Sequence, residues 1–170
     1  LLDNGAPVDG LGLQVHFSGQ PNDPVNILAT LDRYARFNLP IRFTEFDIRT
    51  EDVQLQADFT RDFFILAYSH PSVVGIQLWG FWEGAHWIPS GAMFRSDWSA
   101  KPNAEVYRDL VLHQWRTNVD GVSDAAGLFD VNAFHGDYTI TVQSGSLTSV
   151  RNVRVGAGSA SGKVVIQLLQ

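Results

Sequence analysis

The alternation of apolar and polar residues in the earlier part of the chain predicts three strands, each followed by a helix. Apolar residues alternate with polar or glycine positions in the strands and recur at helical spacing between them. The expected strands cover residues 8–17, 41–48 and 73–79. The expected helices cover residues 24–38, 51–70 and 101–113. Three strand–helix units in succession indicate a parallel α/β sheet.

Two of the helix starts carry capping signals. Asp23 is followed by Pro24, the combination expected for an N-cap and the first helical position. Thr50 is the expected N-cap of the second helix, because Glu51 and Asp52 behind it suit the positive end of the helix dipole. These residues predict where the first two helices begin.

The pattern changes near Thr117. Short β-rich runs separated by glycines follow, and they cover residues 138–142, 147–155 and 163–169. Runs of this length between turn residues are typical of a small antiparallel β domain. We therefore expect two domains, a parallel α/β domain over residues 1–116 and a small β domain over residues 117–170.

Polar side chains recur on one side of each expected parallel strand, near its C-terminal end. Because side chains alternate across a strand, residues two apart share a side. The residues selected in this way are Gln14, His16, Glu45, Asp47, Gln77 and Trp79. The C-terminal ends of parallel strands are where open sheets and barrels form their active sites. We therefore expect these side chains to converge.

Glu45 and Asp47 lie among apolar neighbours, where a carboxylate is costly unless it is paired, hydrogen-bonded or reactive. Two interpretations follow. In the first, both carboxylates are structural and His16 is a core histidine bonded to a backbone carbonyl. In the second, Glu45 is a nucleophile or base, and His16, held between Glu45 and Asp47, orients Glu45 and helps to keep it ionised.

The loop after the third strand holds three tryptophans within nine residues, namely Trp79, Trp82 and Trp87. Indole rings usually belong to a core, but they also stack on the apolar faces of sugar rings while the indole N–H donates to hydroxyls. Their glycine-rich setting after a strand end favours a sugar-binding loop. Glu83 and His86 have a spacing that suits metal ligands on a helix, but this loop lacks a helical pattern, so we expect no metal.

Composition narrows the function classes. The chain has 170 residues, a net charge of -6 and no cysteine, so disulfides, thiolate metal sites and cysteine catalysis are excluded. The 12 basic residues form no cluster, which argues against nucleic-acid binding. No apolar run approaches the roughly 20 residues of a membrane-spanning helix, and no signal peptide is visible. We expect no membrane association and no cofactor.

Residues 8–17, 44–48, 79–87 and 94–102 resemble the C-terminal part of glycoside hydrolase family 10, the endo-β-1,4-xylanases. The resemblance spans about positions 5 to 115, and its segments follow the family's order and spacing. It implies that Glu45 is the nucleophile, with His16 and Asp47 as its hydrogen-bonded partners. The substrate-binding residues that we expect are Gln14, Gln77, Trp79, Trp82, Glu83 and Trp87.

The resemblance also implies the fold of an eight-stranded βα barrel, a TIM barrel, of which residues 1–116 would hold the last three βα units as a catalytic domain. Retaining hydrolysis uses two carboxylates about 5–5.5 Å apart, one to attack the anomeric carbon and one to protonate the leaving oxygen. The family's acid/base glutamate lies in an Asn-Glu pair, which this sequence lacks. Three parallel strands cannot close a barrel, and they leave sheet edges open.

The expected function is retaining endo-β-1,4-xylan hydrolysis through a glycosyl-enzyme intermediate on Glu45. The alternatives are a non-catalytic carbohydrate-binding half-barrel, an inactive xylanase fragment and a purely structural half-barrel. The expected partners are xylan or xylo-oligosaccharides, and a second copy or a complementing barrel fragment that covers the open sheet. The resemblance further implies a secreted or periplasmic protein. We expect the small β domain to be accessory, because it lacks tryptophan.

Overall fold

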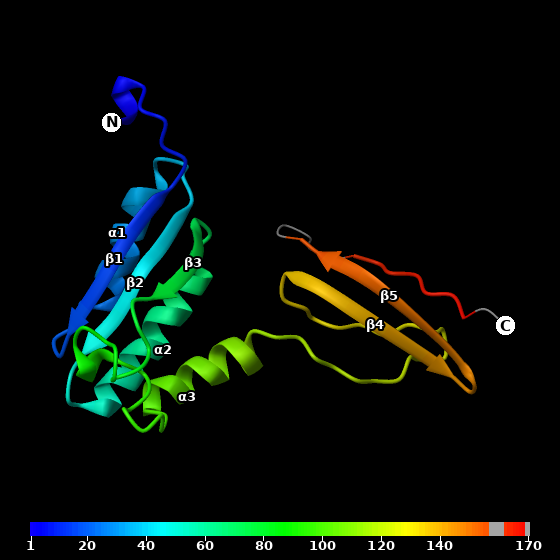
Figure 1. Ribbon diagram of the computed structural model, residues 1–170. Coiled ribbons are helices and arrows are strands. Elements are labelled where there is room, and N and C mark those ends of the chain that lie inside the picture. The colour runs from blue at the N-terminus through cyan, green and yellow to red at the C-terminus, as the bar shows by residue number, and fades with distance from the viewer. Residues whose placement is uncertain (157–161, 169–170) are drawn as a thin grey trace. The chain divides into compact units, whose positions relative to one another are not determined.

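The computed structural model describes residues 1–156 and 162–168, and the chain divides into two compact units, Leu1–Leu110 and Val111–Gln170. Figure 1 shows their elements. The strands are β1 (Leu11–Ser18), β2 (Ile41–Arg49), β3 (Val73–Leu78), β4 (Gly136–Ser144) and β5 (Leu147–Val155). The helices are α1 (Pro24–Ala35), α2 (Val53–Ser69) and α3 (Pro102–Arg108), with short 3-10 turns at Leu2–Asn4 and Pro89–Gly91 and a π-helix at Asp109–Gln114. Among the described residues, no helix has the length and apolar character to cross a bilayer.

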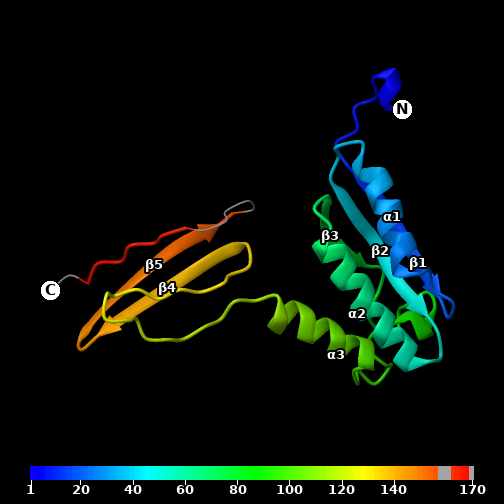
Figure 2. The same cartoon turned by 180° about the vertical axis from the view of Figure 1, so that it is seen from behind.

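The first unit is built on a parallel sheet with the strand order β1-β2-β3, so the predicted parallel α/β arrangement is confirmed. Helices α1 and α2 cover the same face of this sheet, behind it in Figure 1 and in front of it in Figure 2. The opposite face carries the polar side chains that the sequence analysis selected on the strands. On β1, the exposed residues Gly12, Gln14 and His16 alternate with less exposed apolar ones, as the sequence pattern predicts.

A β-bulge at Thr44 adjusts β2 to this sheet. Leu13 pairs with Phe43 and Gln14 with Glu45, so Thr44 is an extra residue without a counterpart on β1. Phe43 and Phe46 therefore both face the helices although they lie three residues apart. Without the bulge, strict alternation would turn Glu45 toward the same side as Phe43.

The core of the first unit is a phenylalanine cluster between the sheet and α2. Phe63 of α2 is 0% exposed. Its ring lies 4.6 to 6.3 Å, centroid to centroid, from the rings of Phe17, Phe43, Phe46, Phe59 and Phe64. Aromatic contacts of this kind stabilise a core beyond the area they bury. The cluster anchors the strands that carry the polar face.

Helix α2 begins two residues later than predicted. The side chain of Asp23 accepts from Val25 N at the start of α1, which confirms the first cap. The prediction of Thr50 as the second cap is wrong, because the Asp52 carboxylate accepts from the backbone N–H groups of Gln54 and Leu55. Thr50 instead accepts from Asp52 N, which fixes the turn before the helix.

In its described part, the second unit holds a hairpin of β4 and β5. The prediction of a third strand over residues 163–169 is wrong, because residues 163–168 form no strand. Leu169 lies outside the described residues. Residues 162–168 run beside β5 in both views (Figures 1 and 2). The Val165 carbonyl, which a ladder would pair with a backbone N–H, accepts from the Arg151 side chain at 2.6 Å. The Arg151 side chain thus takes the place of the backbone N–H that would bond to Val165 in a β-ladder.

Candidate active site

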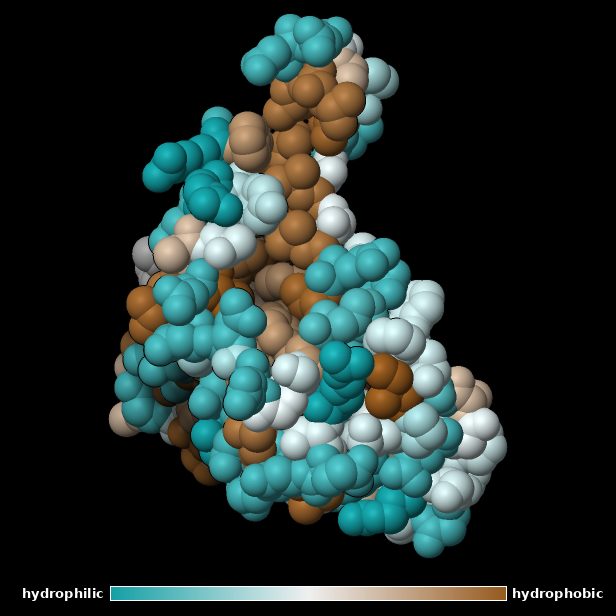
Figure 3. Space-filling view, turned by 90° about the vertical axis from the view of Figure 1, so that its left-hand side faces the viewer, coloured by the Kyte–Doolittle hydropathy of each residue, from teal (hydrophilic) through white to brown (hydrophobic). Residues whose placement is uncertain are grey.

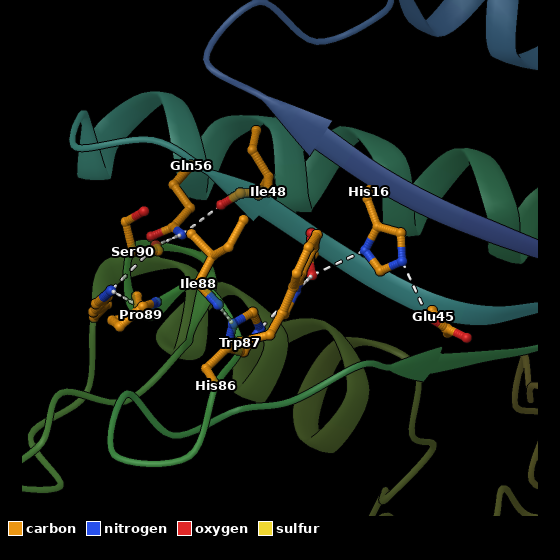
Figure 4. A network of polar contacts seen from close by, with 11 residues as sticks. His16, Glu45, Ile48, Gln56, His86, Trp87, Ile88, Pro89 and Ser90 are labelled. Atoms are coloured by element: carbon orange, nitrogen blue, oxygen red, sulfur yellow. Dashed lines mark hydrogen bonds and ion pairs between the residues drawn. The ribbon is translucent and has the colours of Figure 1, made fainter.

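Strands β1 and β2 place His16 between two carboxylates. His16 Nδ1 lies 3.0 Å from Asp47 Oδ2, and His16 Nε2 lies 3.0 Å from Glu45 Oε2 (Figure 4). Side-chain exposure is 16% for Glu45 and 3% for Asp47. His16 and Asp47 are register partners in the parallel ladder, and the bulge at Thr44 turns Glu45 to the same face. The structure therefore brings these three predicted side chains together.

The hydrogen bonds of this triad restrict its protonation states. Asp47 Oδ2 also accepts from the indole N–H of Trp87 at 2.8 Å, and an ionised carboxylate can only accept. A neutral imidazole has one N–H and can donate to one of its two neighbours. With Asp47 and Glu45 both ionised, the ring satisfies both contacts only as imidazolium. The arrangement suits a role in which the Glu45 carboxylate stays ionised and keeps one orientation.

Two exposed indoles stand beside the triad. The ring of Trp87 lies 5.2 Å from that of His16, and the ring of Trp79 lies 6.3 Å from it, both edge-on. Trp79 is 50% exposed and Trp87 is 56% exposed. Gln14 pairs with Glu45 in the ladder and, like Gln77 of β3, is exposed. An apolar ring face next to a carboxylate and amides is a setting in which a sugar ring can stack and donate its hydroxyls.

Trp82 and Glu83 make their contacts with the segment before α3. The Trp82 ring stacks on that of Trp98 at 4.9 Å and 7°, and its N–H donates to the Ser96 carbonyl. Glu83 Oε1 lies 2.7 Å from Lys101 Nζ, and its Oε2 accepts from Ser96 N. Both carboxylate oxygens of Glu83 are thus engaged within the protein, and a role of these two residues in substrate binding stays a prediction.

The Glu83–Lys101 ion pair makes stability depend on pH. The hydrogen bond from buried Lys101 holds the pKa of Glu83 below its ordinary value of 4.5. The stabilisation is therefore complete above pH 4.5 and is lost as the pH falls through the lowered pKa. We expect Glu83→Gln to lower the free energy of unfolding by about 1 to 2 kcal/mol at pH 7.

Urea unfolding at several pH values checks this expectation. We expect the difference in the free energy of unfolding between wild type and Glu83→Gln to become smaller as the pH is lowered below 4.5. Glu105→Gln is the matched control, since Glu105 forms an exposed pair with Arg108 and its removal changes stability little. A wild-type advantage that is independent of pH would contradict the assignment.

Three further residues lie near the triad, and their contacts there were not predicted from the sequence. His86 is buried with its Nε2 3.8 Å from Asp47 Oδ2. The buried Gln56 side chain donates to the carbonyls of Ile48 and Ser90, at 2.8 and 2.7 Å (Figure 4). The buried Lys101 ammonium lies 3.3 Å from the same Ser90 carbonyl. A glutamine on a helix face and single polar residues in loops carry no pattern that predicts such contacts.

Residues 1–109 match the family model described as glycosyl hydrolase family 10. The anti-sigma-I factor RsgI6 of Acetivibrio thermocellus is 36% identical over 163 residues, which cover 94% of this chain and 21% of that protein. Endo-1,4-beta-xylanase 2 of Arabidopsis thaliana is 29% identical over 168 residues, which cover 99% of this chain and 16% of that protein. The chain thus spans about a fifth or less of the length of these relatives.

Solved structures give the fold. Xylanase 10B from Thermotoga petrophila, in complex with xylobiose, superimposes with a TM-score of 0.60 and 28% identity, over 66% of this chain and 39% of that chain. The predicted fold class, part of a TIM barrel followed by a separate antiparallel strand pair, is confirmed. Because the two curated relatives cover 94% and 99% of the chain, their similarity extends into the second unit. The chain belongs to glycosyl hydrolase family 10.

Proposed function

We propose that this chain carries the nucleophile side of a retaining endo-β-1,4-xylanase, with Glu45 as the nucleophile. The observation that carries the proposal is the His16 imidazole bridging Glu45 and Asp47 at 3.0 Å on each side. A carboxylate attacks a carbon efficiently only when it is ionised and held in one orientation. His16 supplies the first condition by donating to Glu45, and Asp47 supplies the second by holding His16.

The proposed reaction has two steps. A Glu45 oxygen forms a bond to the anomeric carbon of a β-linked xylose while the bond from that carbon to the leaving oxygen breaks. Water then attacks the same carbon, its proton passes to the group that protonated the leaving oxygen, and Glu45 is released as a carboxylate. Trp79 and Trp87 are the proposed stacking surfaces for the sugar rings. Names of relatives support the substrate class, since several are endo-1,4-β-xylanases and the Thermotoga structure contains xylobiose.

The leaving oxygen needs a proton, and we propose that its donor lies outside this chain. The other glutamates are Glu51, Glu83 and Glu105. Glu51 precedes α2, Glu105 lies in the first turn of α3, and Glu83 is paired with Lys101. None of the three is among the contacts of the triad given above. Secretion belongs to the same proposal, because xylan is an extracellular polymer.

An aryl β-xylobioside with a good leaving group, such as 2,4-dinitrophenolate, tests the proposal without the missing acid. Dinitrophenolate departs without protonation, so Glu45 can form the intermediate and release colour. We expect a burst of phenolate from the first turnover, then slower release because the second step lacks its base, and much slower hydrolysis of unactivated xylo-oligosaccharides. Absence of any release at saturating substrate would contradict catalysis by Glu45.

A second candidate function is binding of xylo-oligosaccharides without hydrolysis. The observation that favours it is the 36% identity, over 94% of this chain, to a protein named as an anti-sigma-I factor and not as an enzyme. Calorimetric titration with xylohexaose separates the two candidates. Heat of binding without phenolate release from the activated substrate would support the second. We propose an accessory role for the tryptophan-free residues 117–170 in either case.

The open sheet of the first unit leads to a prediction about assembly. Within the described residues, β1 and β3 are both edge strands, and Leu11, Leu13 and Val15 of β1 are only half-buried. Figure 3 shows a continuous hydrophobic strip on the side of this unit where β1 and α1 lie in Figure 1. Unpaired edges and apolar strips are sites of association. We therefore expect light scattering to give a multiple of 18.8 kDa. A monomer at high concentration would contradict this.

A further inference from the structure

We infer that His86 is a positioning residue for the candidate nucleophile, acting through Asp47. Its buried imidazole holds the Asp47 carboxylate, and Asp47 in turn fixes the orientation in which His16 faces Glu45. The inference rests on the proposed function of Glu45, since only then does the orientation of His16 affect a rate.

Three nitrogens surround one oxygen of Asp47. His16 Nδ1 lies 3.0 Å from Asp47 Oδ2, Trp87 Nε1 lies 2.8 Å from it, and His86 Nε2 lies 3.8 Å from it. The His86 side chain is 0% exposed, so no part of this contact is open to bulk water. A dipole at this distance in a buried setting still acts on the charge of the carboxylate.

The hydrogen bonds of His86 determine its tautomer. Its Nδ1 accepts from the backbone N–H of Ile88 at 3.1 Å, so this nitrogen carries no proton. The proton of the neutral ring is therefore on Nε2, which points at Asp47 and has no hydrogen-bond partner among the described residues. Burial lowers the pKa of His86; the charge of Asp47 opposes this effect, while Lys101 and His16 reinforce it. The ring stays neutral and turns the dipole of its Nε2–H toward Asp47 Oδ2, 3.8 Å away.

The imidazole of His86 lies in a socket built by two glycines. A Cβ atom at Gly80 would lie 2.8 Å from Cδ2 of the ring, and one at Gly91 would lie 3.0 Å from Cε1. The ring therefore occupies space that a side chain at either position would need, and a Cβ at Gly91 would also lie 3.6 Å from Asp47 Cβ. A clamped ring keeps its Nε2–H aimed at the carboxylate at little cost in conformational entropy.

The turn that forms one wall of this socket is itself held in place. Gln56 of α2 donates to the Ser90 carbonyl at 2.7 Å, and Lys101 contacts the same oxygen at 3.3 Å (Figure 4). These contacts fix the turn Pro89–Gly91 and with it the glycine that touches His86. A chain of fixed contacts thus runs from α2 through the turn to His86, Asp47, His16 and Glu45. Supporting contacts of this kind set the precision of a catalytic site.

Two variants of His86 distinguish the effect of its N–H group from the effect of the volume of its ring. In His86→Leu the donor is lost and an apolar side chain fills the socket. In His86→Gln the amide N–H can reach the position of Nε2. We expect His86→Leu to lower kcat for the activated xylobioside by about 10- to 100-fold with KM little changed, and His86→Gln to restore most of kcat. His113→Leu, at an exposed histidine, is the control.

Nitrogen-15 spectra of the histidine side chains provide a readout that does not need activity. We expect His86 of the full chain to keep an unprotonated Nδ1 and a protonated Nε2 at neutral pH and below its ordinary pKa of 6.5. Ordinary titration of His86, or a proton on Nδ1, would overturn the inference. Equal loss of kcat in the leucine and glutamine variants would overturn it as well. If the wild type shows no turnover while His86 has this tautomer, the proposed function fails and the donor geometry stands.

Discussion

Glu45→Gln abolishes phenolate release from the activated xylobioside, with an expected fall in kcat of at least about 10⁴-fold. The amide has nearly the size of the carboxylate, so it fills the same space beside His16. It has no negative charge and cannot form the ester with the anomeric carbon. The loss therefore reports the chemistry and not the fold, which is checked by comparing urea unfolding of the variant with that of wild type.

Two controls sharpen this result. Glu51→Gln makes the same change at an exposed position before α2 and should leave kcat unchanged. Glu45→Gly opens the position to a small external nucleophile, and added azide should restore phenolate release by attacking the anomeric carbon and giving an α-xylosyl azide. Retention of activity in Glu45→Gln would show that another group attacks the sugar.

Phe63→Ala lowers the free energy of unfolding of the first unit by about 3 to 5 kcal/mol. The Phe63 ring is fully buried and contacts five other phenylalanine rings, which come from β1, β2 and α2. Removing it leaves a cavity that so many partners from different elements cannot fill by a small shift. Urea unfolding followed by far-UV circular dichroism measures the change.

Phe37→Ala is the matched control for Phe63→Ala. Phe37 lies just after α1 and is 52% exposed, so the same substitution removes little buried surface there. We expect it to cost about 1 kcal/mol or less. Similar losses in the two variants would mean that the phenylalanine cluster is not the core of this unit.

The parallel sheet and the triad follow from the sequence for a simple reason. Side chains alternate along a regular strand, and no bulge lies between Glu45 and Asp47 in the pairing with β1, so these two share a side. His16 occupies the matching position at the end of the neighbouring strand, and parallel pairing brings the strand ends together. The assignment of Glu45 as nucleophile, in contrast, came from the family resemblance and not from the alternation of residues.

The features that the sequence did not predict depend on contacts between distant residues. The bulge at Thr44 is set by how β2 pairs with both of its neighbours, and no residue of β2 marks it. Thr50 and Asp52 are both good caps, and only the path of the backbone selects Asp52. His86 gains its role from two glycine backbones and from a turn held by Gln56 of α2. None of these contacts has a local signature.

The most direct test of the central claim is covalent labelling with 2,4-dinitrophenyl 2-deoxy-2-fluoro-β-xylobioside. The fluorine destabilises the oxocarbenium-like transition states, and the good leaving group keeps the first step faster than the second, so the glycosyl-enzyme ester accumulates. We predict that mass spectrometry of the whole chain shows one added fluoroxylobiosyl group and that peptide mapping places it on Glu45. A label on another residue, or an unmodified Glu45 in protein that releases phenolate, would contradict the claim.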